Sequence, residues 1–181
     1  VVQLSRFFRP HRLFIEVRHD SWNHPSVEDL MEENDLHLVN VDLPKIKHHI
    51  PFAERVNGGT SFFRLMGRNS ETWDRPWRVE ENKKYIVSDR YNYFYSAEEL
   101  QELFHRIEKV RTRADSTFVI FHTDPQAHSL VNGFQLRHIM ERRNPKVSAP
   151  HNIVKSFPQL RHFCDSNTSA LTSQDLFFSL T

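Results

Sequence analysis

Four short apolar runs, separated by stretches with helical periodicity, constrain the fold of this chain more than any other feature. Each run is rich in branched or aromatic residues and ends in polar or charged ones: residues 13–19 (LFIEVRH), 36–42 (LHLVNVD), 61–68 (SFFRLMGR) and 117–124 (TFVIFHTD). Runs of this length and composition are typical of strands. Because strands that alternate with helices form parallel sheets covered by helices, the sequence predicts an α/β fold with about four parallel strands.

The segments between the runs predict the helices. We expect helices over residues 1–9, 21–33, 98–113 and 132–143. The second has Pro25 near its first turn and Ser26 as its N-cap. The third is the clearest, because Ser96 begins a capping sequence and the apolar residues that follow fall on one stripe.

The composition excludes several classes of protein. The 24 basic and 23 acidic residues give a formal net charge of +1, so charge offers no general argument for nucleic-acid binding. No apolar run approaches the roughly 20 residues of a membrane helix. The first ten residues carry Arg6 and Arg9 and lack the apolar stretch of a signal peptide. The single cysteine, Cys164, can form no internal disulfide. We therefore expect a cytoplasmic, single-domain protein.

Polar residues at the ends of the runs point to a site. In sheets of this kind, ligands bind outside the carboxyl ends of the strands. The chemically capable residues at those ends are Arg18, His19, Asp42, Arg64, Arg68, His122 and Asp124. Charges gathered at one end of consecutive strands are costly to bury without use. The set as a whole therefore predicts a functional site, although each residue alone is more typical of a structural ion pair.

Side chains alternate across a strand, and the alternation predicts two unlike faces. The expected apolar face, under the helices, carries Ile15, Val17, Val39, Val41, Phe63 and Leu65. The expected polar face carries Glu16, Arg18, Asn40, Asp42 and Arg64. A buried parallel strand is normally apolar on both faces, so the polar face suits a barrel interior near its catalytic mouth. Glu16–Arg18 and Asp42–Arg64 are the ion pairs expected if the layer is only structural.

The residue types suggest roles for the predicted site. We expect Asp42 and His122 to act as the acid/base pair, because a histidine titrates near neutral pH. The planar guanidinium groups of Arg18, Arg64 and Arg68 suit a phosphate or carboxylate. In the aromatic run 91–95, Tyr93 is expected to contact the substrate by stacking on a base or sugar.

A metal is an alternative that the residues leave open. His122, Asp42 and Glu16 together could ligate one, but no ligand pattern such as H-E-x-x-H is present. The prediction is therefore a site without a metal, and the sequence names no cofactor.

Several linked segments carry a family resemblance. They are residues 13–22 (LFIEVRHDSW), 62–73 (FFRLMGRNSETW), 90–100 (RYNYFYSAEEL) and 118–125 (FVIFHTDP). In this order they resemble motifs of the YecE-like family, a set of TIM-barrel-like proteins catalogued as a domain of unknown function, number seventy-two. The resemblance covers about residues 11–143 and implies the second half of such a barrel.

Some positions depart from the family pattern. Met66 stands where the family has histidine, Asn92 replaces an aspartate, and His122, Thr123 and Asp124 replace an Asn-Asn-His sequence. The family's reaction is not established, so the resemblance implies a fold and a site location. We expect a phosphate- or sugar-processing, hydrolase-like enzyme acting on a small anionic or sugar-like ligand. The alternative, which the changed positions favour, is a non-catalytic module that binds nucleic acid or protein.

The resemblance also sets the expected domain organisation. Residues 1–143 are predicted to form a partial β/α-barrel domain, and residues 144–181 a poorly ordered tail that contains Ser, Thr and Pro. Four strands cannot close an eight-stranded barrel. We therefore expect the open inner face to be covered by the N-terminal half of the barrel or by self-association, and we expect no membrane partner.

Overall fold

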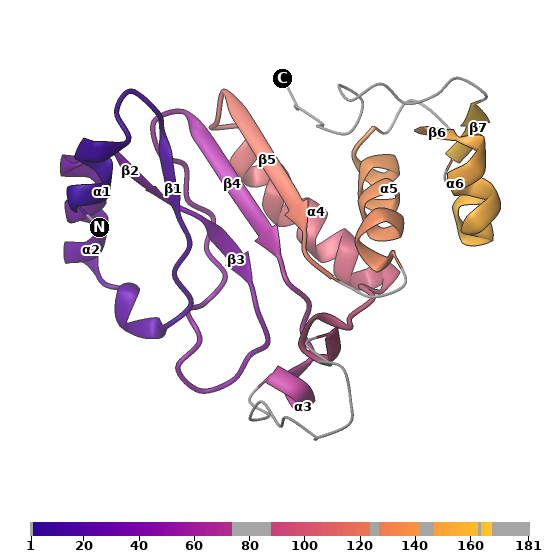
Figure 1. The fold of residues 1–181 in the computed structure, drawn as a ribbon, viewed down its shortest axis with the longest axis horizontal. Coiled ribbons are helices and arrows are strands. Elements are labelled where there is room, and N and C mark those ends of the chain that lie inside the picture. The colour runs from indigo at the N-terminus through magenta and orange to yellow at the C-terminus, as the bar shows by residue number, and fades with distance from the viewer. Residues whose placement is uncertain (1, 74–87, 124–126, 142–146, 163, 168–181) are drawn as a thin grey trace.

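The computed structural model describes residues 2–73, 88–123, 127–141, 147–162 and 164–167 (Figure 1). Its centre is a set of parallel strands: β1 (Leu13–Ile15), β2 (Leu36–Leu38), β3 (Asn40–Asp42), β4 (Thr60–Leu65) and β5 (Ser116–Phe121). β1 pairs with β2, β3 pairs with β4, and β4 pairs with β5, in each case parallel. β2 and β3 follow each other directly, and the N–H of Val39 between them donates to the Ile15 carbonyl at 3.0 Å. The four predicted runs are thus four neighbouring parallel segments.

The described residues hold the four helices that the sequence predicts, in the predicted order, and two short helices that it does not predict. They are α1 (Val2–Phe7), α2 (Pro25–Glu33), α3 (Ser70–Trp73), α4 (Ala97–Arg111), α5 (His128–Met140) and α6 (His151–Ser156). Figure 1 shows α1 and α2 at the β1 edge of the sheet and α4 and α5 beside β4 and β5. In the described residues the sheet does not close into a barrel.

The helix ends confirm one capping prediction and correct another. At α4, the Ser96 hydroxyl accepts from the Glu99 N–H, and the Glu99 carboxylate accepts from the Ser96 N–H, which is the predicted capping box. At α2, the N-cap is His24 and not Ser26: the imidazole Nδ1 accepts from the Ser26 N–H at 3.2 Å. The imidazole nitrogen thus accepts the hydrogen bond that a hydroxyl oxygen usually accepts at an N-cap.

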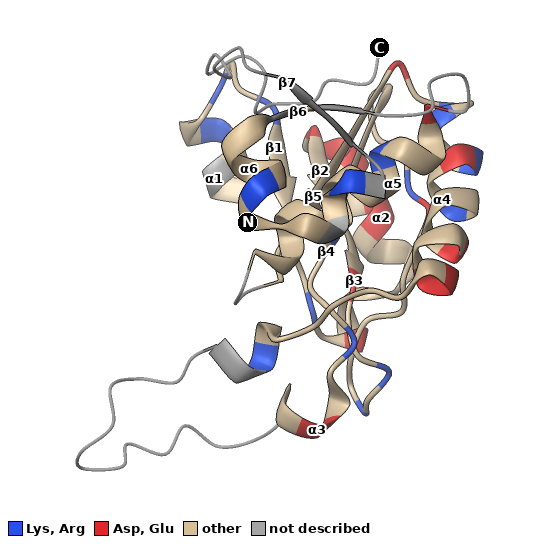
Figure 2. Ribbon diagram, turned by 90° about the vertical axis from the view of Figure 1, so that its right-hand side faces the viewer, with Lys and Arg blue, Asp and Glu red and all other residues tan. Residues whose placement is uncertain are grey.

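Two apolar clusters stabilise the sheet. One joins α2 to the first strands and contains Val17, Met31, Leu36, Leu38, Val39, Val41, Met66 and Trp73. The other packs α4 against β4 and contains Phe63, Leu65, Tyr95, Leu100, Leu103, Phe104, Ile107, Val110 and Leu136. The apolar stripe predicted for the third helix forms the α4 side of this contact. Each fully buried side chain in it stabilises the fold by about 1.5–3 kcal/mol. Acidic and basic residues alternate with others along α4, on the side of the ribbon that faces away from the strands (Figure 2).

The register of β3 corrects one expectation about the faces. Val41 pairs with Arg64, and Asp42 pairs with Leu65. Paired residues in parallel strands point to the same side. Asp42 therefore lies on the helix-covered face beside Leu65, and Val41 lies on the inner face with Arg64. The predicted faces of β3 are therefore reversed: Asn40 and Asp42, expected on the polar face, share the helix-covered face with Phe63 and Leu65, and Val41, expected under the helices, lies on the inner face.

The inner face is polar only near the carboxyl ends of the strands. Farther back it carries a row of aromatic rings, with centroids 5.3 Å apart for Phe14 and Phe62 and 5.9 Å apart for Phe62 and Phe118. Phe118 is 38% exposed, and Ile120 on the same strand is 46% exposed. This part of the face is an apolar surface open to solvent.

The segment after α5 differs from the expected poorly ordered tail. Residues 147–162 hold β6 (Val147–Pro150), α6 and a 3₁₀ turn (Pro158–His162), and β6 pairs in parallel with β7 (Cys164–Asn167). Val154 and Leu160 are buried against Val131 and Phe134 of α5. The short apolar clusters of this segment are thus enough to dock it, while residues 168–181 lie outside the described part. None of the helices that the structure describes is both long and apolar enough to cross a bilayer.

Candidate functional site

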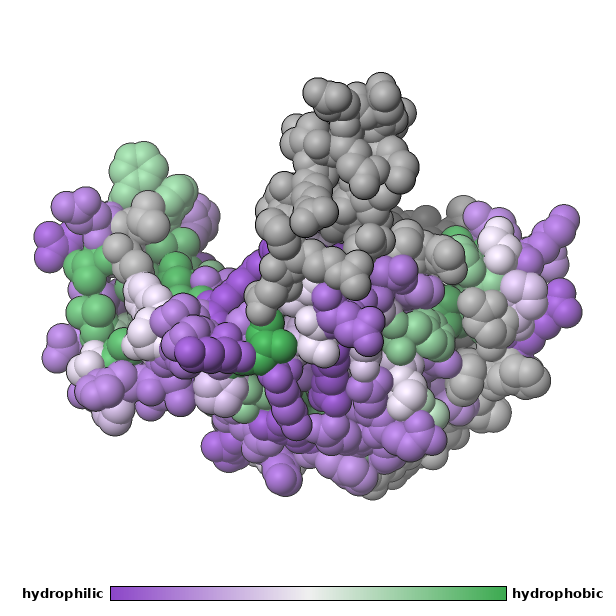
Figure 3. Space-filling model, turned by 90° about the horizontal axis from the view of Figure 1, so that it is seen from below, coloured by the Kyte–Doolittle hydropathy of each residue, from purple (hydrophilic) through white to green (hydrophobic). Residues whose placement is uncertain are grey.

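The charged residues at the carboxyl ends of the strands form two separate networks. Figure 3 looks onto this end of the molecule, where hydrophilic residues predominate across the lower middle of the view. One network lies on the inner face of the sheet and is built around Glu16. The other lies on the helix-covered face and is built around Asp42. The two differ in exposure and in charge balance.

The inner network consists of two arginines that share one carboxylate. Glu16 accepts from the Arg18 Nε at 2.7 Å through one oxygen and from the Arg64 Nη1 at 2.6 Å through the other. Arg64 extends a second nitrogen, Nη2, to within 3.1 Å of the His122 Nδ1. Arg18 donates to the Tyr91 hydroxyl at 3.4 Å, and the ring of Tyr91 lies edge-on to His122 with centroids 4.6 Å apart.

This network carries more positive than negative charge and is accessible to solvent. Two guanidinium groups face one carboxylate, and the side chains of Arg18 and Arg64 are 38% and 31% exposed. Burial lowers the pKa of Arg18, but hydrogen bonds to Glu16 and Tyr91 outweigh it, so the pKa stays above its usual value. Arg18 therefore remains charged. The planar forks of the Arg18 and Arg64 guanidinium groups can receive an anion.

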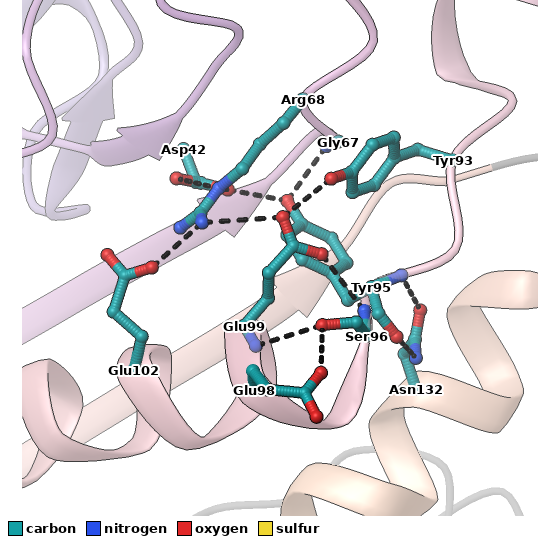
Figure 4. A network of polar contacts seen from close by, with 10 residues as sticks. All are labelled: Asp42, Gly67, Arg68, Tyr93, Tyr95, Ser96, Glu98, Glu99, Glu102 and Asn132. Atoms are coloured by element: carbon teal, nitrogen blue, oxygen red, sulfur yellow. Dashed lines mark hydrogen bonds and ion pairs between the residues drawn. The ribbon is translucent and has the colours of Figure 1, made fainter.

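The second network is closed around Asp42 (Figure 4). The Arg68 Nε donates to both Asp42 oxygens, at 3.1 and 2.9 Å, and the buried Tyr95 hydroxyl donates to Asp42 at 2.8 Å. On its other side, the Arg68 Nη1 lies 2.9 Å from Glu102 and 3.5 Å from Glu99. Arg68 thus joins the end of β3 to the first turns of α4.

The electrostatics of this second network suit a structural role. Asp42 is only 3% exposed, and this burial raises its pKa despite the opposing effect of Arg68 and Tyr95. Burial also raises the pKa of Tyr95 well above its ordinary value, with the neighbouring Asp42 charge adding to the effect. The hydrogen bond from Arg68 lowers the pKa of Glu102. Because Arg68 already contacts three carboxylates, it has little positive charge and few N–H groups left to bind an external anion.

A glycine turn connects the two networks. Gly67 follows β4 with φ +87°, and its N–H donates to the Tyr95 hydroxyl at 2.8 Å. A Cβ at this position would lie 2.5 Å from the Tyr93 Cβ, so glycine is required on both conformational and steric grounds. Tyr93 itself donates its hydroxyl proton to Glu99 at 2.6 Å. Asn132 of α5 holds the backbone of Tyr95 at both its N–H and its carbonyl.

The structure distributes the predicted site residues between these networks. Arg18, Arg64 and His122 come together on the inner face. Asp42 and Arg68 lie in the buried network, and Tyr93 lies beside it. The expected Asp42–Arg64 pair is wrong: Asp42 pairs with Arg68, and Arg64 pairs with Glu16. The reason is the register of β3, which turns Asp42 away from Arg64. Asp42 and His122, the predicted acid/base pair, accordingly belong to different networks.

Other predicted groups also come apart, and new partners appear. Among the described residues, Glu16, Asp42 and His122 do not bring ligand atoms together as a metal site would. Asp124 lies outside the described residues. The sequence shows Tyr91 and Tyr95 only as members of the aromatic run 91–95, and it suggests no role for Glu102. The spacing Glu16-x-Arg18 indicates the Glu16–Arg18 ion pair. No local pattern predicts that Tyr95, 53 residues away in the sequence, hydrogen-bonds to Asp42.

Two of the positions that depart from the family pattern, Met66 and Thr123, are packed into the fold. Met66 is fully buried in the first apolar cluster. Thr123 is fully buried, and its N–H donates to the Ser129 hydroxyl at 3.0 Å. His122, a third such position, is itself part of the Glu16 network through its contact with Arg64.

Comparison with solved structures places the fold among known proteins. The chain is similar to a DUF72 family protein from Thermotoga maritima, with 26% identity, a TM-score of 0.67, and coverage of 77% of this chain and 49% of that one. It is also similar to a DUF72 family protein from Enterococcus faecalis, with 27% identity, a TM-score of 0.65, and coverage of 81% and 55%. The chain thus spans about half the length of these TIM-barrel-like relatives. No protein with a curated description matches it.

The family comparison agrees with the structural one. Residues 1–156 match the family described as "Protein of unknown function DUF72", for which YecE-like is another name. This match includes the five central strands, both networks and α6. The chain therefore belongs to the DUF72 family.

Proposed function

We propose that the Glu16 network is an anion-binding site, and that the chain contributes it to a phosphate- or sugar-processing, hydrolase-like enzyme. One observation carries the proposal: two arginines converge from β4 and the end of β1 on a single carboxylate, beside a histidine, at the carboxyl ends of parallel strands. Enzymes with parallel β/α barrels place their chemistry at this end. The excess guanidinium charge selects an anionic group.

The contacts of the network suggest a role for each residue. Glu16 holds Arg18 and Arg64 in fixed orientations, so the remaining N–H groups of both forks are preorganised for phosphate or carboxylate oxygens. His122 is held by Arg64 and by the ring of Tyr91. Arg64 has only donors, so the His122 Nδ1 must accept. Proton transfer by His122 then has to use its other ring nitrogen, Nε2.

Asp42, Arg68 and Tyr93 have a different role in this proposal. They fix the turn at Gly67 and the start of α4, and so hold the end of β4 in place. We therefore assign anion binding to Arg18 and Arg64 and leave Asp42 out of the proton transfer. The substrate and any reaction remain proposals that rest on the inner network alone.

A binding module without catalysis is a second candidate. The observation that favours it is Met66, which fills the position of the family histidine with a buried apolar side chain. Such a module would bind an anionic ligand, including a nucleic-acid phosphate, through the same arginines but would not turn it over.

Titration of the chain with inorganic phosphate and with a sugar phosphate tests the proposal. Arg64→Ala should weaken binding by about 1.5–3 kcal/mol, the range for charge-assisted hydrogen bonds. Arg64→Lys should recover only part of this loss, because an ammonium group lacks the bidentate fork. Arg111→Ala is the matched control, since Arg111 pairs with Glu108 on the surface of α4, away from the strand ends.

Stability measurements on the same variants separate binding from structure. If Arg64→Ala lowers the melting temperature but leaves phosphate affinity unchanged, the network is structural and the proposal fails. If Arg64→Ala loses phosphate binding without losing stability, and the wild-type chain hydrolyses no sugar phosphate, the binding module is the better description.

A further inference from the structure

A second group of titratable side chains lies outside both networks, where the chain leaves β1. His19, Asp20 and His48 are all exposed, and their candidate ligand atoms lie within 4.8 Å of one another. The His19 Nδ1 is 3.2 Å from one Asp20 oxygen, and the His48 Nδ1 is 3.5 Å from the other. The two imidazoles lie almost parallel, at 8°, with centroids 5.3 Å apart.

The backbone holds these residues together although they are far apart in sequence. The Asp20 N–H donates to the His48 carbonyl at 3.0 Å, and the Ile50 N–H donates to the Arg18 carbonyl at 2.7 Å. An isolated antiparallel bridge joins His19 to His49. His48 has φ +64°, a left-handed conformation that a residue with a side chain rarely adopts. Such strain persists only where surrounding contacts impose it, and it often marks a functional position.

The hydrogen bonding of His19 leaves two acceptors facing each other. Its Nδ1 accepts from the Ser21 N–H at 3.2 Å, so in the neutral ring this nitrogen carries a lone pair. The Asp20 oxygen at 3.2 Å carries lone pairs as well. A metal ion between the two atoms makes this contact favourable, and it takes the Nδ1 lone pair in place of the Ser21 N–H.

The donor set selects the kind of cation. Two imidazole nitrogens and one carboxylate oxygen suit Zn²⁺ and related transition-metal ions, whereas Mg²⁺ and Ca²⁺ prefer oxygen alone. In a tetrahedral zinc site with bonds of about 2.0–2.1 Å, ligand atoms lie about 3.3 Å apart. The three ligand atoms lie within 4.8 Å of one another, so a bound ion would draw them together by up to about 1.5 Å. Water can complete the coordination because all three residues are exposed.

We propose that His19, Asp20 and His48 form a surface site for a divalent transition-metal ion such as Zn²⁺. The site is independent of the anion-binding proposal, since it shares no residue with the Glu16 network. His19 directly follows Arg18, so a bound ion would also fix the segment that carries Arg18.

Calorimetric titration of the untagged chain with Zn²⁺ tests this site, and the visible absorption of added Co²⁺ gives a second readout of the ligand set. The chain has 12 histidines, so weak Zn²⁺ binding at other positions is expected. The test is therefore the difference in Zn²⁺ affinity between the wild type and each variant. His19→Asn, Asp20→Asn and His48→Asn should each weaken the strongest Zn²⁺ site by about tenfold or more. Asparagine tolerates the left-handed conformation at position 48, so this variant keeps the turn while it removes the imidazole.

His24→Asn is the matched control. His24 is exposed and makes the same local contacts with Ser26 that His19 makes with Ser21, but it belongs to no such group of three. We expect its Zn²⁺ affinity to equal that of the wild type. Two results would overturn the proposal. One is a loss of Zn²⁺ affinity in His24→Asn as large as in His19→Asn. The other is a wild-type chain whose strongest Zn²⁺ site is no tighter than that of a variant carrying all three substitutions.

Discussion

The Nη2 of Arg64 lies 3.1 Å from the Nδ1 of His122. An arginine side chain can only donate, so this contact fixes the imidazole as an acceptor at Nδ1 and places the proton of the neutral ring on Nε2. Through the same guanidinium, His122 is linked to Glu16, which accepts from Arg64 at 2.6 Å. The tautomer of the histidine is therefore set by a residue of the adjacent strand.

Nitrogen chemical shifts of His122 should show this tautomer directly. In the wild-type chain near pH 7.5 we expect the proton on Nε2. In Arg64→Leu the constraint is absent and both tautomers should be populated. A wild-type spectrum with the proton on Nδ1 would contradict the contact and the role that we assign to Nε2.

Two substitutions of His122 should separate binding from proton transfer. Asparagine places its amide oxygen close to the position of Nδ1 and can still accept from Arg64. His122→Asn should therefore keep phosphate affinity near that of the wild type and lose any turnover. His122→Leu removes the acceptor as well, and we expect it to weaken phosphate binding. Equal phosphate affinities for the two variants would show that Arg64 needs no support from position 122.

Replacing the Tyr95 hydroxyl should destabilise the fold more than replacing that of Tyr93. Tyr95 is fully buried, and its hydroxyl serves both the Asp42 carboxylate and the Gly67 N–H. Tyr95→Phe leaves both without that partner and should lower the free energy of unfolding by about 1–3 kcal/mol. Tyr93→Phe is the control, because it removes one bond to Glu99 at a partly exposed position. Urea denaturation of both variants measures the difference, and a larger loss for Tyr93→Phe would show that the Asp42 network is not the structural one.

His37 should make the chain less stable in mild acid. It is 4% exposed, it packs against Phe14 and Gly58, and its Nε2 has no hydrogen-bond partner among the described residues. Burial lowers its pKa below the ordinary value of 6.5. Near that pH the unfolded chain therefore binds more protons than the folded one, so the stability contribution is full above it and is lost as the pH falls through it.

Thermal melts between pH 7.5 and 5.5 test this contribution. His37→Phe should show a smaller fall in melting temperature over that range than the wild type, because the titrating group is gone. His24→Asn, which removes an exposed histidine, should behave as the wild type. If the fall in His37→Phe is as steep as in the wild type, other groups determine the acid sensitivity.

The sequence predicts the sheet well because its signals are local. The alternation in β4 and the apolar stripe of α4 each require burial on one side, and their contact follows. The local sequence does not determine on which face of the sheet the Asp42 side chain lies. In residues 36–42 apolar side chains occupy both phases of the alternation, so the pattern does not say which phase meets the helices. The outcome depends on Tyr95 and Arg68, which reach Asp42 from other elements.

The docked segment after α5 shows the same limitation. Val154 and Leu160 lie in short apolar clusters between polar residues, a composition that also fits disorder. Their burial depends on the surface that α5 offers through Val131 and Phe134. Periodicity within the segment itself carries no information about that surface.

The exposed apolar part of the inner face should drive self-association of the 181-residue chain. Ile120 is 46% exposed on β5, next to the aromatic row that ends at Phe118, and an open apolar sheet face favours association. Ile120→Lys should shift the chain towards monomer in sedimentation velocity over a range of concentrations. Leu30→Lys is the control, because Leu30 is 38% exposed on α2 and lies off this face. A wild-type chain that stays monomeric at high concentration, or an equal effect of both substitutions, would remove the inner face as the cause of association.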